Sequence, residues 1–233
     1  MSTSDPAAAG QPGAPPVPLR RSALLQARSR RTRQALVRAA LDLWSKRGFE
    51  TGVEETTVEE IAKAAGVTKG TFYFHFARKE HILLEMGWAT AQVVYDEATR
   101  ALAAGLPPAA TLDALMASLA RRVEAAPKPA VARAVAEFQR VPGPKPLDEE
   151  HFGFVRAFTA VFADAQARGL LDDREPADEL GAMLQALTTD AIMRWATSDQ
   201  EGLRERLQRR AALLLTAIGG PAGRSPQGDA ASS

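Results

Sequence analysis

The sequence predicts an all-α protein of about nine helices. From about residue 20 to residue 218, apolar residues recur three or four positions apart almost throughout, which is the spacing of amphipathic helices. Glycine and proline gather at the breaks, as in GLPP, PKP and PGPKP. No set of alternating segments could build a sheet. The two ends, residues 1–19 and 219–233, are rich in Ala, Pro, Gly and Ser and are expected to be disordered tails.

The first predicted helix covers residues 29–46 and is stopped by Gly48. After a loop, the second helix begins at Thr57 in the run TVEE. The Thr57 hydroxyl and the Glu60 carboxylate can each accept a hydrogen bond from the other residue's backbone N–H, which is a capping box. This helix is expected to end at Gly66.

The third helix begins at Thr68 and contains the aromatic run TFYFHF. As a strand of period two, the run would place Phe72, Phe74 and Phe76 on one face. We favour a short helix over residues 68–76, because helices are predicted on both sides and no partner strand is in view. Phe72 and Phe76 can then pack together into a core, and Phe74 is expected to be partly buried.

Another side of this short helix gathers polar groups. Cations, hydroxyl groups and a ring N–H suit phosphate oxygens and base edges, and a glycine leaves room for close approach. A helix, a tight glycine turn and a second short helix form a helix-turn-helix, whose second helix enters the DNA major groove. An ordinary helical corner is the alternative. The polar set comprises Lys69, Gly70, Thr71, Tyr73 and His75.

A fourth helix over residues 79–104 leads into a C-terminal part with five more. On the last two helices, apolar stripes favour either a four-helix interface between two subunits or burial within one chain. The five helices are expected at about residues 111–126, 130–140, 148–168, 176–198 and 200–218. The stripes are Leu180, Leu184, Leu187, Ala191 and Trp195, and then Leu203, Leu207, Ala211, Leu214 and Ile218.

The charge distribution divides the chain into a basic N-terminal third and an acidic remainder. Residues 20–79 hold 13 Lys or Arg and 6 Asp or Glu, a balance of +7, and the rest of the chain carries 16 and 22, a balance of −6. A basic segment on an acidic body is typical of a protein that binds a polyanion, although a solvated helix face is the alternative.

Composition also excludes several classes of site. The chain has no cysteine, which rules out disulfides, thiolate metal sites and cysteine nucleophiles, and its three histidines are too few for a zinc site made of histidine alone. No apolar run reaches the roughly 18 residues of a membrane span, and the N-terminus has no apolar signal-peptide region. We therefore expect a cytoplasmic protein without a metal or a cofactor.

The segment TTVEEIAKAAGVTKGTFYFHFARKEHIL resembles the DNA-binding signature of the TetR family of bacterial transcription regulators, and the resemblance covers residues 30–84. It implies an all-α homodimer. Each subunit would begin with a basic arm and a three-helix DNA-binding head over residues 20–84. A body over residues 85–218 would follow, which binds a small ligand and dimerises through its last two helices. Carried over by position, the residues that would contact bases or phosphates are Thr57, Lys69, Gly70, Thr71, Tyr73, His75 and Lys79.

The sequence departs from the family pattern at two places. The loop before the second helix is longer and acidic, with ETGVEE between Phe49 and Thr56. Where the family often has Pro-Ser before the fourth helix, this chain has Ala77 and Arg78, which loses a side-chain cap. Arg78 could add a phosphate contact instead.

Before the head, the basic stretch LRRSALLQARSRRTR is longer than the head needs. Such an arm could follow the DNA backbone or enter an adjacent minor groove, and a solvated tail is the alternative. The candidate arm contacts are Arg28, Arg30, Arg31 and Arg33.

Aromatic residues are spread through the body, where Phe154, Phe158 and Phe162 recur every four residues. Such a stripe is more often plain core, but the family resemblance implies a mostly apolar ligand cavity. His151 and Arg156 could bind an anionic group, although exposed side chains are the common case. The candidates for the cavity wall are Trp88, Tyr95, Phe138, Phe154, Phe158, Phe162, Met183 and Asp190.

These features predict a homodimeric regulator that binds a palindromic site on double-stranded DNA, most often a repressor released by a small, mostly apolar effector. An activator, a helix-turn-helix protein that no ligand gates, and a helix-turn-helix used for protein contacts are alternatives. An all-α enzyme is the rival from another class. Against it, the sequence shows no Ser/His/Asp order, no phosphate-binding glycine loop and no metal-ligand spacing.

Overall fold

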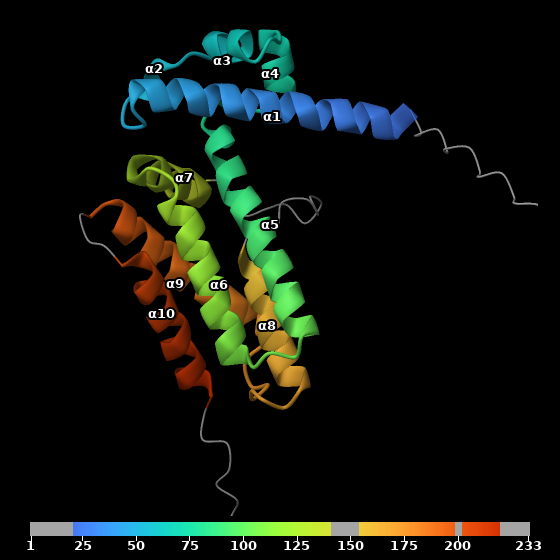
Figure 1. Cartoon of the computed structure of the whole chain (residues 1–233), viewed down its shortest axis with the longest axis vertical. Helices are drawn as coiled ribbons and strands as arrows, with labels where there is room; N and C mark the ends of the chain where they lie inside the picture. The colour runs from blue at the N-terminus through green and yellow to red at the C-terminus, as the bar shows by residue number, and fades with distance from the viewer. Residues whose placement is uncertain (1–20, 141–153, 199–201, 220–233) are drawn as a thin grey trace, which may run out of the picture.

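The computed structural model of the chain describes residues 21–140, 154–198 and 202–219 (Figure 1). Over these residues the chain forms α-helices and no strand, which confirms the all-α prediction. The expected tails, the expected helix start at residue 148 and His151 lie outside the described residues. The helices are α1 (Arg21–Arg47), α2 (Gly52–Glu55), α3 (Val58–Ala64), α4 (Lys69–His75), α5 (His81–Ala103), α6 (Pro108–Glu124), α7 (Lys128–Arg140), α8 (Phe154–Ala167), α9 (Ala177–Ala196) and α10 (Leu203–Ile218).

Two elements differ from the prediction. Helix α1 begins at Arg21, so residues 21–33 of the basic stretch that we expected to be an arm are themselves the first turns of the helix. The segment RSALLQAR contains good helix formers and neither Gly nor Pro, so nothing stops the helix there. The additional helix α2 lies within the acidic loop, where the Thr56 hydroxyl donates to the Gly52 carbonyl oxygen at 2.6 Å.

A tight turn joins α3 to α4. Gly66 has φ +69°, a left-handed conformation that favours glycine, and the Val67 amide donates to the Ala62 carbonyl oxygen at 2.9 Å. The turn therefore ends α3 as the sequence predicted and lets α4 begin at once.

The described residues form two hydrophobic cores, and α5 belongs to both. The N-terminal head, made of α1 to α4, packs around Trp44, Ile61 and Phe72, and α5 adds Ile82 and Leu83 to this core. Further along α5, Val94 and Ala98 belong to the core of the body. Figure 1 shows α5 running from beneath α1 down along the body. A single continuous helix therefore connects the head to the body.

The body is a bundle of α5 to α10, in which α8 lies against α9 and α10 against α6. Helices α8 and α9 approach very closely at Gly181, where an added Cβ would lie 2.3 Å from Thr159 Oγ1. The apolar stripes of α9 and α10 are mostly buried inside this bundle, with Leu184, Leu203 and Leu207 fully enclosed. Burial within one chain therefore accounts for these stripes. Within the described residues, no helix has the length and hydropathy needed to cross a membrane.

Candidate DNA-binding head and body cavity

Helix α4 is held to the head by its two inward phenylalanines. Phe72 and Phe76 are buried, and their ring centroids lie 5.7 Å apart, as the helical prediction required. The Thr68 hydroxyl accepts a hydrogen bond from the Thr71 amide at 3.1 Å, which caps the start of the helix. Anchoring one face in this way fixes which side chains point outward.

The outward face of α4 carries Lys69 and Tyr73, one turn apart. Tyr73 is 50 % exposed, and the Lys69 ammonium lies 6.0 Å from the centre of its ring. Lys69 also pairs with Glu59 of α3, and this carboxylate raises the pKa of the Lys69 ammonium. Gly70 lies between them with open space around its Cα, because an added Cβ would meet only the Thr68 hydroxyl at 3.8 Å.

Phe74 corrects the prediction of partial burial, because it is 79 % exposed. Two residues on from Phe72, it projects from the opposite side of the helix to the buried pair. Its ring lies edge-on to the neighbouring His75 ring, at 5.1 Å between centroids.

His75 lies at the end of α4 and is partly buried. Burial, followed by the positive charge of Arg33, lowers the pKa of the His75 imidazole below its ordinary value. The ring is therefore mainly neutral near pH 7, and a neutral imidazole still has one N–H to donate.

Thr57 begins α3 with the predicted capping box. The Glu60 amide donates to the Thr57 hydroxyl at 3.2 Å, and the Thr57 amide donates to a Glu60 carboxylate oxygen at 2.8 Å. The Arg47 guanidinium, with these Thr57 contacts, lowers the pKa of Glu60 to about 2. The exposed Thr57 is thus fixed at the helix start, as the capping-box prediction required.

Lys79 has a role that sequence reasoning did not find. Its ammonium donates to the carbonyl oxygens of Glu54, at 2.8 Å, and Thr56, at 2.7 Å. These bonds satisfy carbonyls at the end of α2. An ammonium has three N–H donors, so one stays available for a phosphate.

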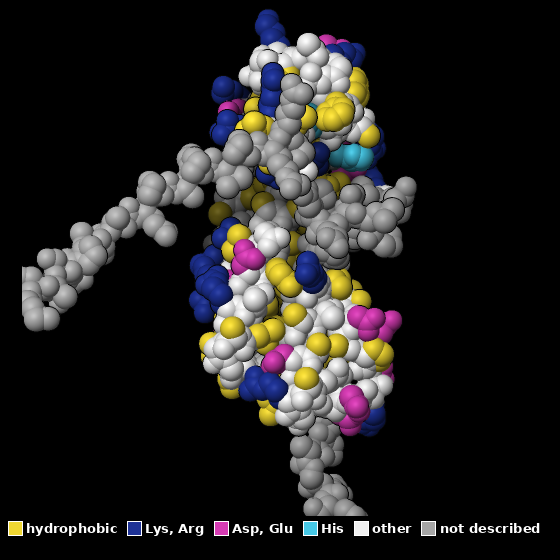
Figure 2. All heavy atoms as spheres, turned by 90° about the vertical axis from the view of Figure 1, so that its right-hand side faces the viewer, with side chains coloured by type: hydrophobic (Ala, Val, Ile, Leu, Met, Phe, Trp, Pro, Cys, Tyr) yellow, Lys and Arg dark blue, Asp and Glu magenta, His cyan; other side chains and the backbone are white. Residues whose placement is uncertain are grey.

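The candidate arm residues fall into two groups. Arg28, Arg30 and Arg31 are exposed on the N-terminal half of α1. The Arg33 guanidinium is instead built into the head: it pairs with Glu85, donates to the His75 carbonyl oxygen at 2.8 Å and lies 4.3 Å from the centre of the Phe76 ring. Figure 2 shows Lys and Arg side chains around the top of the head on one face of the molecule.

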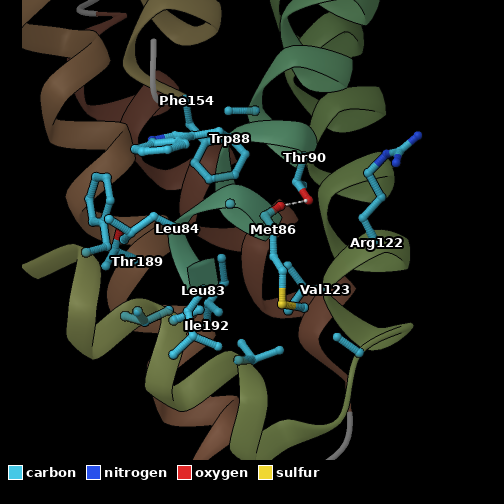
Figure 3. A pocket seen from close by; sticks show the side chains of 17 residues that line it. Leu83, Leu84, Met86, Trp88, Thr90, Arg122, Val123, Phe154, Thr189 and Ile192 are labelled. Carbon is cyan, nitrogen blue, oxygen red and sulfur yellow. Dashed lines mark hydrogen bonds between the residues drawn. The ribbon is translucent and has the colours of Figure 1, made fainter. Parts of the chain in front are cut away.

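The body contains an apolar cavity of about 120 Å³ below the head. Three of the predicted wall residues line it, Trp88 of α5, Phe138 of α7 and Phe154 of α8. In Figure 3 the side chains of Met86 and Val123 point toward each other across another part of it, and the Arg122 guanidinium points away. The cavity is therefore an almost wholly apolar site.

The other predicted wall residues lie elsewhere. Phe158 and Phe162 are fully buried in the core of the body, so the common core interpretation holds for them. Tyr95 packs partly buried against that core with the Arg156 guanidinium 4.5 Å from its ring centre. Met183 is 50 % exposed on α9, and Asp190 forms ion pairs with arginines of α9 and α10.

Sequence reasoning missed most of the cavity wall. Short and aliphatic side chains form it, and their spacing is the same as that of any buried helix face, so aromatic residues alone were a poor guide. Its polar residues include two threonines, Thr90 and Thr189, and the Thr90 hydroxyl already donates to the Met86 carbonyl oxygen at 2.9 Å. The missed residues are Leu83, Leu84, Met86, Gly87, Thr90, Ala91, Arg122, Val123, Ala126, Val131, Ala134, Val135, Thr189 and Ile192.

A helix-turn-helix with an outward polar face, on a helical body with an apolar cavity, defines the class of helix-turn-helix regulators. The family model for bacterial regulatory proteins of the tetR family matches residues 36–86. The head therefore carries the DNA-binding domain of the TetR family of transcriptional regulators, as the resemblance implied.

Individual relatives support this placement. The transcriptional regulator TcmR of Streptomyces glaucescens is 48 % identical over 61 residues, which are 26 % of this chain and 25 % of TcmR. The transcriptional repressor KstR2 of Rhodococcus jostii (strain RHA1) is 33 % identical over 85 residues, 36 % of this chain and 42 % of KstR2. The chain thus spans less than half the length of these curated relatives.

A solved structure extends the likeness to the body. The TetR family repressor FadR of Thermus thermophilus, in complex with lauroyl-CoA, has a TM-score of 0.69 at 28 % identity, covering 84 % of this chain and all of that one. The fold is therefore shared over both head and body.

Proposed function

We propose that the chain is a homodimeric repressor that binds a palindromic operator through α4 and is released by a small, mostly apolar ligand. The outward face of α4 is the observation that carries the proposal. Phe72 and Phe76 bind the helix to the head, and this leaves Lys69, Tyr73 and Phe74 turned to the surface. A short helix presented in this way suits the major groove.

Each outward side chain of α4 suits one kind of contact. The Lys69 ammonium and the Thr71 hydroxyl can bond to base edges or adjacent phosphates, and Gly70 allows the DNA to approach the helix closely. The Tyr73 phenol donates to a phosphate. Phe74 has no polar atom, so it packs against a thymine methyl group or a sugar.

Phosphate contacts fix the register of the head on DNA. The neutral imidazole N–H of His75 and the third N–H of the Lys79 ammonium are the proposed donors. The Thr57 hydroxyl donates to a Glu60 carboxylate oxygen at 3.1 Å, so it reaches a phosphate only by exchanging that bond. On α1, Arg28, Arg30 and Arg31 add cations that reach the backbone beside the operator half-site. Arg33 is left out of this set because the head itself uses its guanidinium.

Dimerisation in this proposal uses the outer faces of α9 and α10, since the apolar stripes lie inside the chain. Met183 on α9 is 50 % exposed and Leu213 on α10 is 62 % exposed. We expect Leu213→Glu to lower the dimer fraction in sedimentation equilibrium. An unchanged dimer would reject this face.

The cavity supports an apolar ligand of limited size. Its volume of about 120 Å³ is close to that of an engineered cavity that binds benzene. Thermus thermophilus FadR binds lauroyl-CoA, whose acyl chain is apolar. The cavity as it stands suits a ring or a short branched chain, and because it is partly open to the surface, a longer acyl chain would extend beyond it.

Release from the operator follows from linkage. A ligand that binds the body more tightly when the two heads are wrongly spaced for the operator weakens DNA binding by the same free energy. Helix α5, which belongs to both cores, carries part of this coupling. Apo protein should therefore bind the operator, and ligand should reduce that affinity.

Capture of genomic DNA tests the proposal directly. Sheared DNA from the source genome would be retained on the purified full-length chain at near-physiological salt and sequenced. A palindromic motif near the chain's own gene or a neighbouring gene is the expected result. If all DNA fragments were retained equally, or none were, sequence-specific binding would be rejected. The enzyme and the helix-turn-helix used for protein contacts would then be the remaining alternatives.

A further inference from the structure

Helix α7 has two functional faces. One face lines the cavity with residues spaced by three or four positions, namely Val131, Ala134, Val135 and Phe138. Arg133 and Glu137, also four apart, project from the other side of the helix. Both of these charged side chains bind the head.

The Glu137 carboxylate is held between the body and the head. Although charged, it is only 2 % exposed. It accepts a hydrogen bond from the Arg78 guanidinium, and His81 Nε2 lies 3.7 Å from the same oxygen. Arg140, one turn further along α7, lies 3.8 Å from the other oxygen. A buried carboxylate depends on such partners, so α7 and the start of α5 are tied together.

Arg133 makes a second, separate connection to the head. Its guanidinium donates to the Glu54 carboxylate at 2.5 Å and to the Glu50 carbonyl oxygen. Glu54 belongs to α2, whose last carbonyl groups bind the Lys79 ammonium. Helix α7 therefore binds α2 through Arg133, and it binds the junction of α4 and α5 through Glu137.

The head partners of α7 come from the two places where this sequence departs from the family pattern. Glu50 and Glu54 belong to the long acidic loop, and Arg78 stands where the family often has serine. These departures supply the carboxylate and the guanidinium that α7 binds. They therefore have a use in this chain that the family's DNA contacts do not explain.

We propose that α7 transmits occupancy of the cavity to the DNA-binding head through the ion pairs Arg133–Glu54 and Glu137–Arg78. The inference rests on the proposed function, and it adds a route beside α5. A group that fills the cavity presses on Val131, Ala134 and Val135 and displaces α7. Because ion pairs of this kind depend on geometry, the displacement moves α2 and the start of α5.

A cavity-filling substitution can stand in for the unidentified ligand. Ala91 lines the cavity from α5 and is 2 % exposed, so Ala91→Leu places an isobutyl group in the cavity space. The ion pairs are removed by combining Arg133→Gln with Glu137→Leu, which leaves the net charge unchanged. Operator affinity is measured for the wild type, for A91L, for R133Q/E137L and for the triple variant.

The expected result is that A91L weakens operator binding by about fivefold or more in the wild-type background, the lower end of ordinary allosteric coupling. In the R133Q/E137L background the same substitution should change the affinity by less than about twofold. The matched control is R174Q/D172N, which removes an ion pair of 2.9 Å in the loop between α8 and α9 with no net charge change, and it should leave the A91L effect intact.

An A91L effect of equal size in both backgrounds would overturn the inference and leave α5 as the route. Should A91L fail to fold by circular dichroism, Val135→Leu fills the same cavity from α7 itself. If neither folded variant alters operator affinity, α7 does not transmit cavity occupancy. Failure of the proposed function is distinguishable, because the wild type itself would then not bind the operator selectively.

Discussion

The head and the body place their functional side chains in different ways. In the head, one seven-residue helix carries the outward side chains that we propose contact the bases, and its orientation follows from two phenylalanines four residues apart. In the body, the cavity is what stays unfilled where α5 to α9 pack together. A surface site can therefore be set by local periodicity, whereas a cavity depends on packing between helices distant in sequence.

The largest expected effect comes from removing one ring from each core. Phe72 and Phe158 are fully buried, and Phe→Ala at such sites costs about 3–5 kcal/mol. Phe72→Ala should abolish operator binding, because it frees α4 from the head. Phe158→Ala should loosen the body and affect the cavity first.

Chemical denaturation followed by Trp fluorescence measures both variants. If Phe158→Ala abolished operator binding at temperatures where the body stays folded, the division of roles between the two cores would be wrong.

The contrast between local periodicity and packing of distant helices also determines how much of the structure could be predicted from the sequence. The capping box at Thr57, the turn at Gly66 and the inward pair of α4 depend on residues within five positions of each other, and all were predictable. The hydrogen bond between Arg33 and Glu85 joins residues that are 52 positions apart. The hydrogen bond from Lys79 to the Glu54 carbonyl oxygen in α2 joins residues that are 25 positions apart. Nothing in local spacing indicates such partners.

Lys79 gives the next largest effect, because it serves both the head's structure and the proposed phosphate contact. Lys79→Ala removes two charge-assisted hydrogen bonds and should cost about 1–2 kcal/mol of unfolding free energy. If the third N–H meets a phosphate, the slope of log affinity against log salt should also fall by about one.

Operator titrations at several salt concentrations separate the two roles of Lys79. A stability loss with an unchanged slope would assign Lys79 to the head's structure alone. The exposed Lys63 is a control, as Lys63→Ala removes a charge without those bonds.

Phe74→Ala should weaken operator binding by about 1 kcal/mol, or about fivefold, because it removes an apolar contact at the centre of the interface. The melting temperature should not fall, since the ring is 79 % exposed. Fluorescence anisotropy with an operator duplex measures the change. Equal affinity in the variant and the wild type would show that Phe74 does not touch the DNA.

His75 makes operator binding depend on pH. In the free head its pKa lies below the ordinary value, and a nearby phosphate would raise it, so binding takes up a proton. Affinity should therefore rise, by about twofold to threefold, as the pH falls from 8 toward 6. His75→Gln should flatten this profile. A wild-type profile that is already flat would place the imidazole away from phosphate.

The smallest expected effect is on the melting temperature, through the pKa of Glu60. This pKa has one contribution from neighbours in sequence and one from a distant residue. The pKa of Glu60, about 2, is depressed first by Arg47 at the end of α1 and then by Thr57 in the same capping box. A depressed pKa means that this stabilisation is present above pH 4.5 and is lost as the pH falls toward 2. Melting temperatures of Glu60→Gln and of wild type should therefore differ at pH 7 and converge near pH 2.

Two further substitutions assign the cause. Arg47→Gln removes the long-range partner and keeps the capping box, whereas Thr57→Ala does the reverse. If the ion pair with Arg47 dominates, Arg47→Gln should reduce the melting-temperature difference that Glu60→Gln makes at pH 7 more than Thr57→Ala does. The opposite order would mean that four neighbouring residues determine this carboxyl group by themselves, so that even its pKa was within reach of the sequence.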